Sequence, residues 1–280
     1  MININILGIL KDAFMFPSKN TGRFAIYLLL SVLMTGFALG GILTYGLGIL
    51  DSENYLIGGM YLIISMLIAF ILTGYHINII RSGIRLDDDV PVFKLYENFM
   101  TGFDNVVVAI FYYLIPTLIV LIISFDTNLF SNAANIVEEF VMQAVNVLIM
   151  GESADLALNA LSHTISTFVN SLAITITAAL ILFIIFYFLQ SIAEARLANT
   201  GSVREAMNIF ETLKDIKRIG IGRVILIILL ISIIYAIIGT ILLVVFGNHL
   251  FLLLVFVIVL TPYLGLVTRR ALGLLYSDIA

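Results

Sequence analysis

GYHINIIRSGIRLDDDVPVFKLYENFMTGFDN, residues 74–105, decides how the rest of the chain is interpreted. An apolar run ends here in Arg81 and Arg85. An acidic segment, Asp87–Asp89, then leads to Pro91, after which a second apolar run begins. Because proline disfavours helical geometry in the residue before it, one helix is predicted to end here and another to begin. The pattern is typical of a point where a chain leaves a membrane.

Composition gives the same indication for the whole chain. Of its 280 residues, 61% are hydrophobic and 11% are charged, and the mean hydropathy is +1.14. Soluble domains carry about 25% charged residues, so the class of soluble globular proteins is excluded. The chain has no cysteine, so it offers no disulfide, no thiolate nucleophile and no cysteine-bound metal.

Six apolar runs are long enough to span a bilayer, since a helix needs about 20 residues to cross a hydrocarbon core about 30 Å thick. They occupy residues 24–50, 55–80, 106–125, 167–193, 224–246 and 250–268. The predicted fold class is therefore all-α: a polytopic membrane helical bundle forming a single domain, residues 1–280. Pro116 and Pro262 lie within two of the spans and are candidate helix-break positions, because proline removes a backbone donor.

Outside the spans, one-sided apolar stripes predict short amphipathic helices in the membrane interface. Such stripes begin near Met1, Val92 and Val203. Residues 126–166 form the longest segment between spans and are expected on the outer side. Their stripe over 136–149 also predicts an amphipathic helix.

Two further patterns concern local structure and symmetry. Ser202 with Glu205 has the spacing of a capping box. The order of interfacial helix, outward span and inward span occurs three times. The third and first units also share a spacing, Tyr75 with Arg81 and Tyr263 with Arg269. A threefold internal repeat is one interpretation of this order.

The distribution of charge predicts an orientation. All 14 lysines and arginines fall in segments that this arrangement assigns to the side of the two termini. Basic residues near spans collect on the cytoplasmic side, so both termini are expected in the cytoplasm. We expect a plasma-membrane protein whose cytoplasmic face is basic and meets anionic lipid.

The residues from about Ala69 to Pro116 resemble a known family. The pair Gly74 and Tyr75, the basic Arg81, Pro91 followed by Phe93, and Gly102 before the third span are similar to the archaeal membrane family called domain of unknown function 4013. The resemblance implies a multi-pass protein and no assigned activity. Lys94 departs from the acidic or polar residue expected after the proline, which argues against a role that needs an acidic patch there.

The candidate contacts with lipid or a partner are Arg81, Arg85, Arg269 and Arg270, which end two spans. Arg81 and Arg85 are four residues apart and share a helical face. The alternative is that these arginines only fix orientation and extend toward the interface. The run Asp87–Asp89 suits either a divalent cation or, more simply, a solvated loop that ends a helix.

Two other groups of residues allow more than one interpretation. His76 and Asn78 suit a proton path or polar packing between helices. Gln190 and Glu194 share a face of the fourth span and suit transport or anchoring at headgroups. No HExxH or GxSG motif of an intramembrane protease is present.

These observations predict a non-catalytic membrane scaffold or accessory protein, with no enzymatic activity, cofactor or metal. Its expected partners are the bilayer, in particular anionic headgroups, together with a membrane protein or a second copy of the chain. No nucleic acid is expected. The alternative function is a permease or flippase for a small amphiphilic solute, in which Pro116 and Pro262 would line a cavity.

Overall fold

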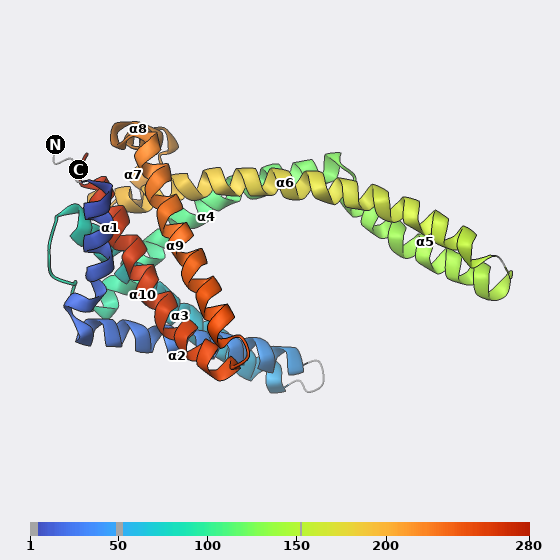
Figure 1. Cartoon of the computed structure of the whole chain (residues 1–280), viewed down its shortest axis with the longest axis horizontal. Helices are drawn as coiled ribbons and strands as arrows, with labels where there is room; N and C mark the ends of the chain where they lie inside the picture. The colour runs from blue at the N-terminus through green and yellow to red at the C-terminus, as the bar shows by residue number, and fades with distance from the viewer. Residues whose placement is uncertain (1–4, 49–52, 152) are drawn as a thin grey trace. The chain divides into compact units, whose positions relative to one another are not determined.

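The computed structural model describes residues 5–48, 53–151 and 153–280, which form helices, turns and loops but no strand (Figure 1). The elements are α1 (Ile6–Met15), the short η1 (Pro17–Lys19), α2 (Thr21–Leu47), α3 (Glu53–Ile84), α4 (Leu95–Asp126), α5 (Leu129–Ile149), α6 (Ala154–Thr200), α7 (Val203–Ala206), α8 (Ile209–Ile219), α9 (Ile221–Phe246) and α10 (Leu250–Tyr276). Within this described part, six helices are long and apolar enough to cross a membrane, namely α2, α3, α4, α6, α9 and α10. The all-α prediction with six spans is confirmed.

Most of the membrane-spanning helices are longer than the apolar runs from which they were predicted. α3 runs on to Ile84 and α4 begins at Leu95, so the acidic run and Pro91 separate two helices as predicted. The stripe that starts near Val92 does not form a helix of its own, because nothing between Leu95 and the predicted third span interrupts α4. The end of the predicted first span, residues 49–50, falls outside the described residues.

The two candidate helix-break positions lie inside continuous helices. Pro116 is within α4 and Pro262 is within α10, and neither residue ends its helix. Neighbouring helices and nearby hydroxyl groups satisfy backbone groups freed by proline in many membrane helices, which makes this placement physically acceptable.

The chain divides into two compact units, residues 1–109 with 188–280 and residues 110–187. The sequence predicted one domain, and α4 and α6 contribute residues to both units.

In the second unit α5 lies beside α6 (Figure 1). Asn132 Nδ2 donates to Ser171 Oγ at 2.7 Å, which joins these two helices. The predicted amphipathic helix over 136–149 is part of α5.

In the first unit α10 contacts α3, α9 and α1, and α2 lies along α3 (Figure 1). The described core is rich in aromatic rings: Tyr27 and Tyr75 lie with ring centroids 5.7 Å apart, and Phe16 is fully buried. α1 was predicted as an interfacial helix. Its buried residues Ile9 and Ala13 pack within the protein, since α1 lies along α10.

Two glycines allow α3 and α4 to touch through their backbones. A Cβ atom on Gly74 would lie 1.7 Å from the carbonyl oxygen of Asn98, and one on Gly102 would lie 1.8 Å from that of Phe70. Small residues are common where membrane helices approach this closely. This contact gives a structural reason for both glycines in the family resemblance, and it positions the loop that joins the two helices.

Candidate functional site

A cavity of about 680 Å³ opens where the chain passes from α3 to α4. Its lining includes four basic side chains, those of Arg23, Arg81, Arg85 and Lys94, and four acidic ones, those of Asp87, Asp88, Asp89 and Glu97. We call it the Arg81 cavity. Its volume lies in the usual range for small-ligand sites, about 300 to 1,000 Å³.

Arg81 is the half-buried cation of this cavity. Its Nε donates to the carbonyl oxygen of Ala198 at 2.9 Å, and its Nη1 donates to Asn78 Oδ1 at 2.8 Å. Among the described residues, no carboxylate forms an ion pair with Arg81. The side chain is therefore held in place by uncharged acceptors that leave its positive charge uncompensated, and Arg81 is one of the residues that line the cavity.

Other charges on the cavity wall also lack an ion-pair partner within the described part of the chain. Arg23 and Arg85 form no ion pair there, and neither do the carboxylates of Asp87 and Asp89. By contrast, Lys94 pairs with Glu97 at 2.9 Å. Charges of both signs are thus available to a ligand in the same cavity.

The loop that forms the cavity rim is fixed by contacts from three elements. Tyr75 Oη donates to the carbonyl oxygen of Pro91 at 3.2 Å, and the Tyr75 ring lies 4.4 Å from that of Phe93. Arg270 Nη1 donates to the carbonyl oxygen of Asp87 at 2.8 Å. Lys19 pairs with Asp88 at 3.0 Å. Val90 is also buried. The rim is therefore a built feature of the fold.

The first turn of this loop has an unusual backbone. Leu86 has φ 57°, in the left-handed region that glycine normally occupies at a helix end. The Asp87 N–H donates to the Ser82 carbonyl at 2.9 Å and the Leu86 N–H donates to the Gly83 carbonyl at 3.1 Å. These two bonds close α3 and turn the chain toward the acidic residues.

The structure gives Arg270 a different role from the lipid or partner contact predicted for it. Only 1% of the residue is exposed. Its Nε donates to Asp12 Oδ2 at 2.8 Å, its Nη1 donates to Ser82 Oγ at 3.0 Å, and its guanidinium lies 4.3 Å from the centroid of the Phe16 ring. Arg270 thus joins α1, α3 and α10 beneath the cavity rim.

Arg269, the fourth predicted contact, also points into the protein. Its Nη1 pairs with Glu194 Oε2. Asn105 Nδ2 donates to Glu194 Oε1 at 3.1 Å, and Gln190 Nε2 donates to the same oxygen at 2.8 Å. We call these four residues the Glu194 cluster. Because Glu194 is 2% exposed, its carboxylate is engaged by protein donors and does not reach headgroups as the sequence interpretation favoured.

The polar residues near the end of α3 face neighbouring helices. Tyr27 Oη and His76 Nε2 are 2.6 Å apart, and Asn78 Nδ2 donates to Asn98 Oδ1 at 2.7 Å. Two buried amide atoms have no partner in the described part of the chain, Asn98 Nδ2 and Asn105 Oδ1. Both belong to α4, seven residues apart, so they lie on one side of that helix.

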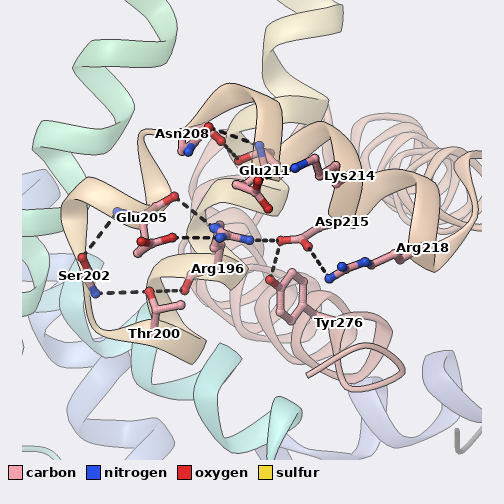
Figure 2. A network of polar contacts seen from close by, with 11 residues as sticks. Arg196, Thr200, Ser202, Glu205, Asn208, Glu211, Lys214, Asp215, Arg218 and Tyr276 are labelled. Atoms are coloured by element: carbon pink, nitrogen blue, oxygen red, sulfur yellow. Dashed lines mark hydrogen bonds and ion pairs between the residues drawn. The ribbon is translucent and has the colours of Figure 1, made fainter.

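A second network holds α7 and α8 against the ends of α6 and α10 (Figure 2). Arg196 Nη1 donates to Asp215 Oδ2 at 2.7 Å, and its Nη2 donates to Glu205 Oε2 at 2.9 Å. Tyr276 Oη donates to the same Asp215 oxygen at 2.7 Å. Ser202 Oγ accepts from the Glu205 N–H at 3.3 Å, the first half of the predicted capping box. The Glu205 carboxylate binds Arg196, because a charge-assisted bond is stronger than a neutral one.

Of the four basic residues that line the cavity, sequence patterns identified Arg81 and Arg85 as candidate contacts but not Arg23 or Lys94, and they did not identify the residues that hold the site in place. Asp12, Lys19 and Asp215 come from elements far away in sequence, and no local spacing links them to Arg270, Asp88 or Arg196.

Across the described residues there is no group of three or more His, Asp or Glu side chains placed to hold a metal ion. The arrangement supplies cation and carboxylate contacts for a polar ligand, next to apolar helices.

Comparison with known proteins gives a family. The family model described as "Protein of unknown function (DUF4013)" matches residues 57–247, which include Arg81, Arg85 and Glu194. No curated protein and no solved structure matches the chain. Since the match covers more than half of the sequence and six helices have the length and composition of membrane spans, this is a membrane protein that belongs to the DUF4013 family.

Proposed function

We propose that this chain is a non-catalytic membrane scaffold or accessory protein of the plasma membrane, with both termini in the cytoplasm. Its basic face engages the phosphate groups of lipid headgroups through the Arg81 cavity and so fixes the protein, and any membrane partner it carries, in the cytoplasmic leaflet. The observation that carries the proposal is the half-buried guanidinium of Arg81, held by uncharged acceptors and directed at a cavity at the end of a span.

Electrostatics favours a phosphate at this place. A basic residue near an anionic surface contributes about 1 kcal/mol, and Arg81 and Arg85 stand one helical turn apart on the same wall. A guanidinium binds phosphate through two parallel hydrogen bonds, which a lysine cannot reproduce. Arg81 is partly buried and has no ion-pair partner among the described residues, so its guanidinium has less water to lose when a phosphate arrives, which favours binding further.

Native mass spectrometry of the purified chain with its co-purifying lipids tests this proposal. Arg81→Gln with Arg85→Gln is expected to lower the fraction of lipid-bound protein about fivefold for each charge lost. Arg81→Lys with Arg85→Lys keeps the charge but removes the planar donors, so it is expected to show an intermediate loss.

Arg204→Gln is the matched control, because Arg204 is an exposed arginine on α7 outside the cavity. It is expected to leave the bound lipid unchanged. Equal lipid retention by the wild type and both double variants would reject the cavity as a phosphate site and leave these arginines as topology signals.

A permease or flippase for a small amphiphilic solute is the second candidate. The Glu194 cluster favours it, because an ionisable pair between membrane helices is costly and often functional, and because the buried amide oxygen of Asn105 has no hydrogen-bond partner among the described residues. If this function is correct, vesicles containing the chain should move a fluorescent phospholipid between leaflets, and Glu194→Gln should stop the movement. Vesicles that behave as protein-free vesicles do would exclude this candidate.

A further inference from the structure

The lining of the Arg81 cavity carries as many acidic as basic side chains. A site for a purely anionic headgroup would gain nothing from Asp87 and Asp89, whose carboxylates would repel it. Neither carboxylate is neutralised by an ion pair within the described residues, whereas the neighbouring Asp88 is paired with Lys19. The cavity therefore presents uncompensated charges of both signs within the described residues, on a rim that contacts from α3, η1 and α10 hold in place.

We propose that this cavity binds a zwitterionic phospholipid headgroup, with the phosphate diester on Arg81 and Arg85 and a primary ammonium on Asp87 and Asp89. The inference rests on the proposed function and names the class of lipid that the same site selects. Phosphate and ammonium are separated by two carbons in such a headgroup, so both ends fit within one cavity of about 680 Å³.

The chemistry of the wall selects a primary over a quaternary ammonium. Quaternary ammonium groups are recognised by the faces of aromatic rings. Among the described residues that line the cavity there is no aromatic ring; the uncharged ones are Asn78, Ser82, Val90, Pro91 and Val92. Carboxylates instead accept hydrogen bonds, and an ammonium with N–H groups donates them while a quaternary one does not. The short apolar edge, Val90 to Val92, leaves a place for the glycerol end of the lipid.

The position of the rim also favours a bilayer lipid over a soluble compound. The cavity begins at the end of α3, a helix that has the length and composition of a membrane span, and Arg81 lies on its last turn. A headgroup in the adjacent leaflet reaches this level without leaving the bilayer.

The test uses the full-length chain in detergent, with an equimolar mixture of dioleoyl phosphatidylethanolamine, phosphatidylcholine and phosphatidylglycerol, and measures bound lipid by native mass spectrometry. The wild type is expected to bind about five times as much of the ethanolamine lipid as of either other lipid. A factor of about five corresponds to the free energy of about one charge contact, about 1 kcal/mol. Asp87→Asn with Asp89→Asn should abolish the preference over the glycerol lipid, because the ammonium loses its acceptors while the phosphate contacts remain.

The matched control is Asp126→Asn with Glu138→Gln, which removes two exposed carboxylates elsewhere and should keep the preference. The Asp87 contact to Arg270 uses the backbone carbonyl, so the test variant keeps it. If the double asparagine variant lowers the melting temperature, Asp89→Asn alone replaces it. The logarithm of the ratio of bound ethanolamine lipid to bound glycerol lipid should then fall by about half as much as in the double variant.

The outcomes separate the two proposals. A wild type that retains phosphatidylglycerol or phosphatidylcholine as well as phosphatidylethanolamine, while Arg81→Gln with Arg85→Gln lowers all three, rejects the zwitterion and keeps the phosphate site. If neither the arginine variants nor the aspartate variants change the amount of bound lipid, both the phosphate site and the zwitterionic headgroup are rejected. If soluble glycerophosphoethanolamine displaces the lipid at equal concentration, the ligand is not specifically a lipid and that assignment is overturned.

Discussion

The guanidinium of Arg270 and the carboxylate of Asp12, 258 residues apart in the chain, form an ion pair with 2.8 Å between Nε and Oδ2. This pair fastens α1 to the end of α10. Because the same guanidinium also donates to the Asp87 carbonyl, the position of α1 is connected to the rim of the Arg81 cavity. Loss of the pair should therefore affect both the N-terminal helix and the cavity.

Asp12→Asn is expected to lower the free energy of unfolding by about 2 kcal/mol, the usual range for a lost hydrogen bond to a charged group. Arg270 is nearly fully buried, so its charge stays in place without its counter-ion. Thermal unfolding in detergent measures the effect, and cleavage of α1 by a protease reports its release. Asp88→Asn, at an exposed carboxylate that pairs with Lys19, should leave the melting temperature unchanged. A control as unstable as the test variant would contradict this account.

The docking of α1 should also depend on pH. Burial by itself raises the pKa of Asp12, but the hydrogen bonds and charges of Arg270 and Lys19 outweigh it and hold the pKa below its ordinary value of 3.8. A lowered pKa contributes stability that is present above pH 3.8 and is lost as the pH falls through the folded-state pKa. Protease cleavage of α1 should therefore increase below pH 3.8. In Asp12→Asn the rate should not change over that window.

Gly74→Ala and Gly102→Ala should each separate α3 from α4, because the added methyl groups would lie 1.7 Å and 1.8 Å from backbone carbonyl oxygens. Backbone atoms cannot move aside as a flexible side chain does, so we expect a loss of about 3 kcal/mol or more. Gly59→Ala is the control within α3, since its Cβ would meet nothing within 4 Å. Thermal unfolding compares the three. Stability equal to that of the control would show that the helices are farther apart.

The Arg196 network predicts a local effect on α7 and α8. Asp215→Asn removes the carboxylate that Arg196 and Tyr276 share, at a residue 2% exposed, and should cost about 3 kcal/mol. Tyr276→Phe loses one hydrogen bond and should cost about 1 kcal/mol. Hydrogen exchange of α8 amides is expected to rise more in Asp215→Asn than in Tyr276→Phe. Glu211→Gln, on the exposed Lys214 pair, should not change the exchange rate.

The proposed orientation can be tested with single cysteines, because the native chain has none. Asn248→Cys, at an exposed residue between α9 and α10, should react with an impermeant thiol reagent added to sealed cells. Asp89→Cys, on the exposed cavity rim, should react only after the membrane is opened. Ser82 is unsuitable for this purpose because it is 6% exposed and accepts a bond from Arg270. Reaction of Asp89→Cys in sealed cells would reverse the orientation.

The sequence by itself determined the helical class, the number of apolar helices and the end of α3, because these depend on local quantities. Run length, hydropathy and the break at Pro91 act within a few residues of one another. The placement of Arg81 and Arg85 on one helical face follows from their spacing of four residues alone. The glycines of the α3 and α4 contact were also visible, through the family resemblance, but their function as a backbone contact was not.

Only the tertiary structure decided which arginines remain available to a ligand. Arg81 and Arg270 both end apolar spans, and nothing near either of them in sequence tells them apart. Arg270 meets Asp12 across 258 residues and is buried. Within the described part of the chain, Arg81 meets a carbonyl and an amide oxygen but no carboxylate, so its charge stays uncompensated there. The pairing of a charge depends on which helices pack together, and that packing is set by the summed fit of many apolar side chains, which no local pattern encodes.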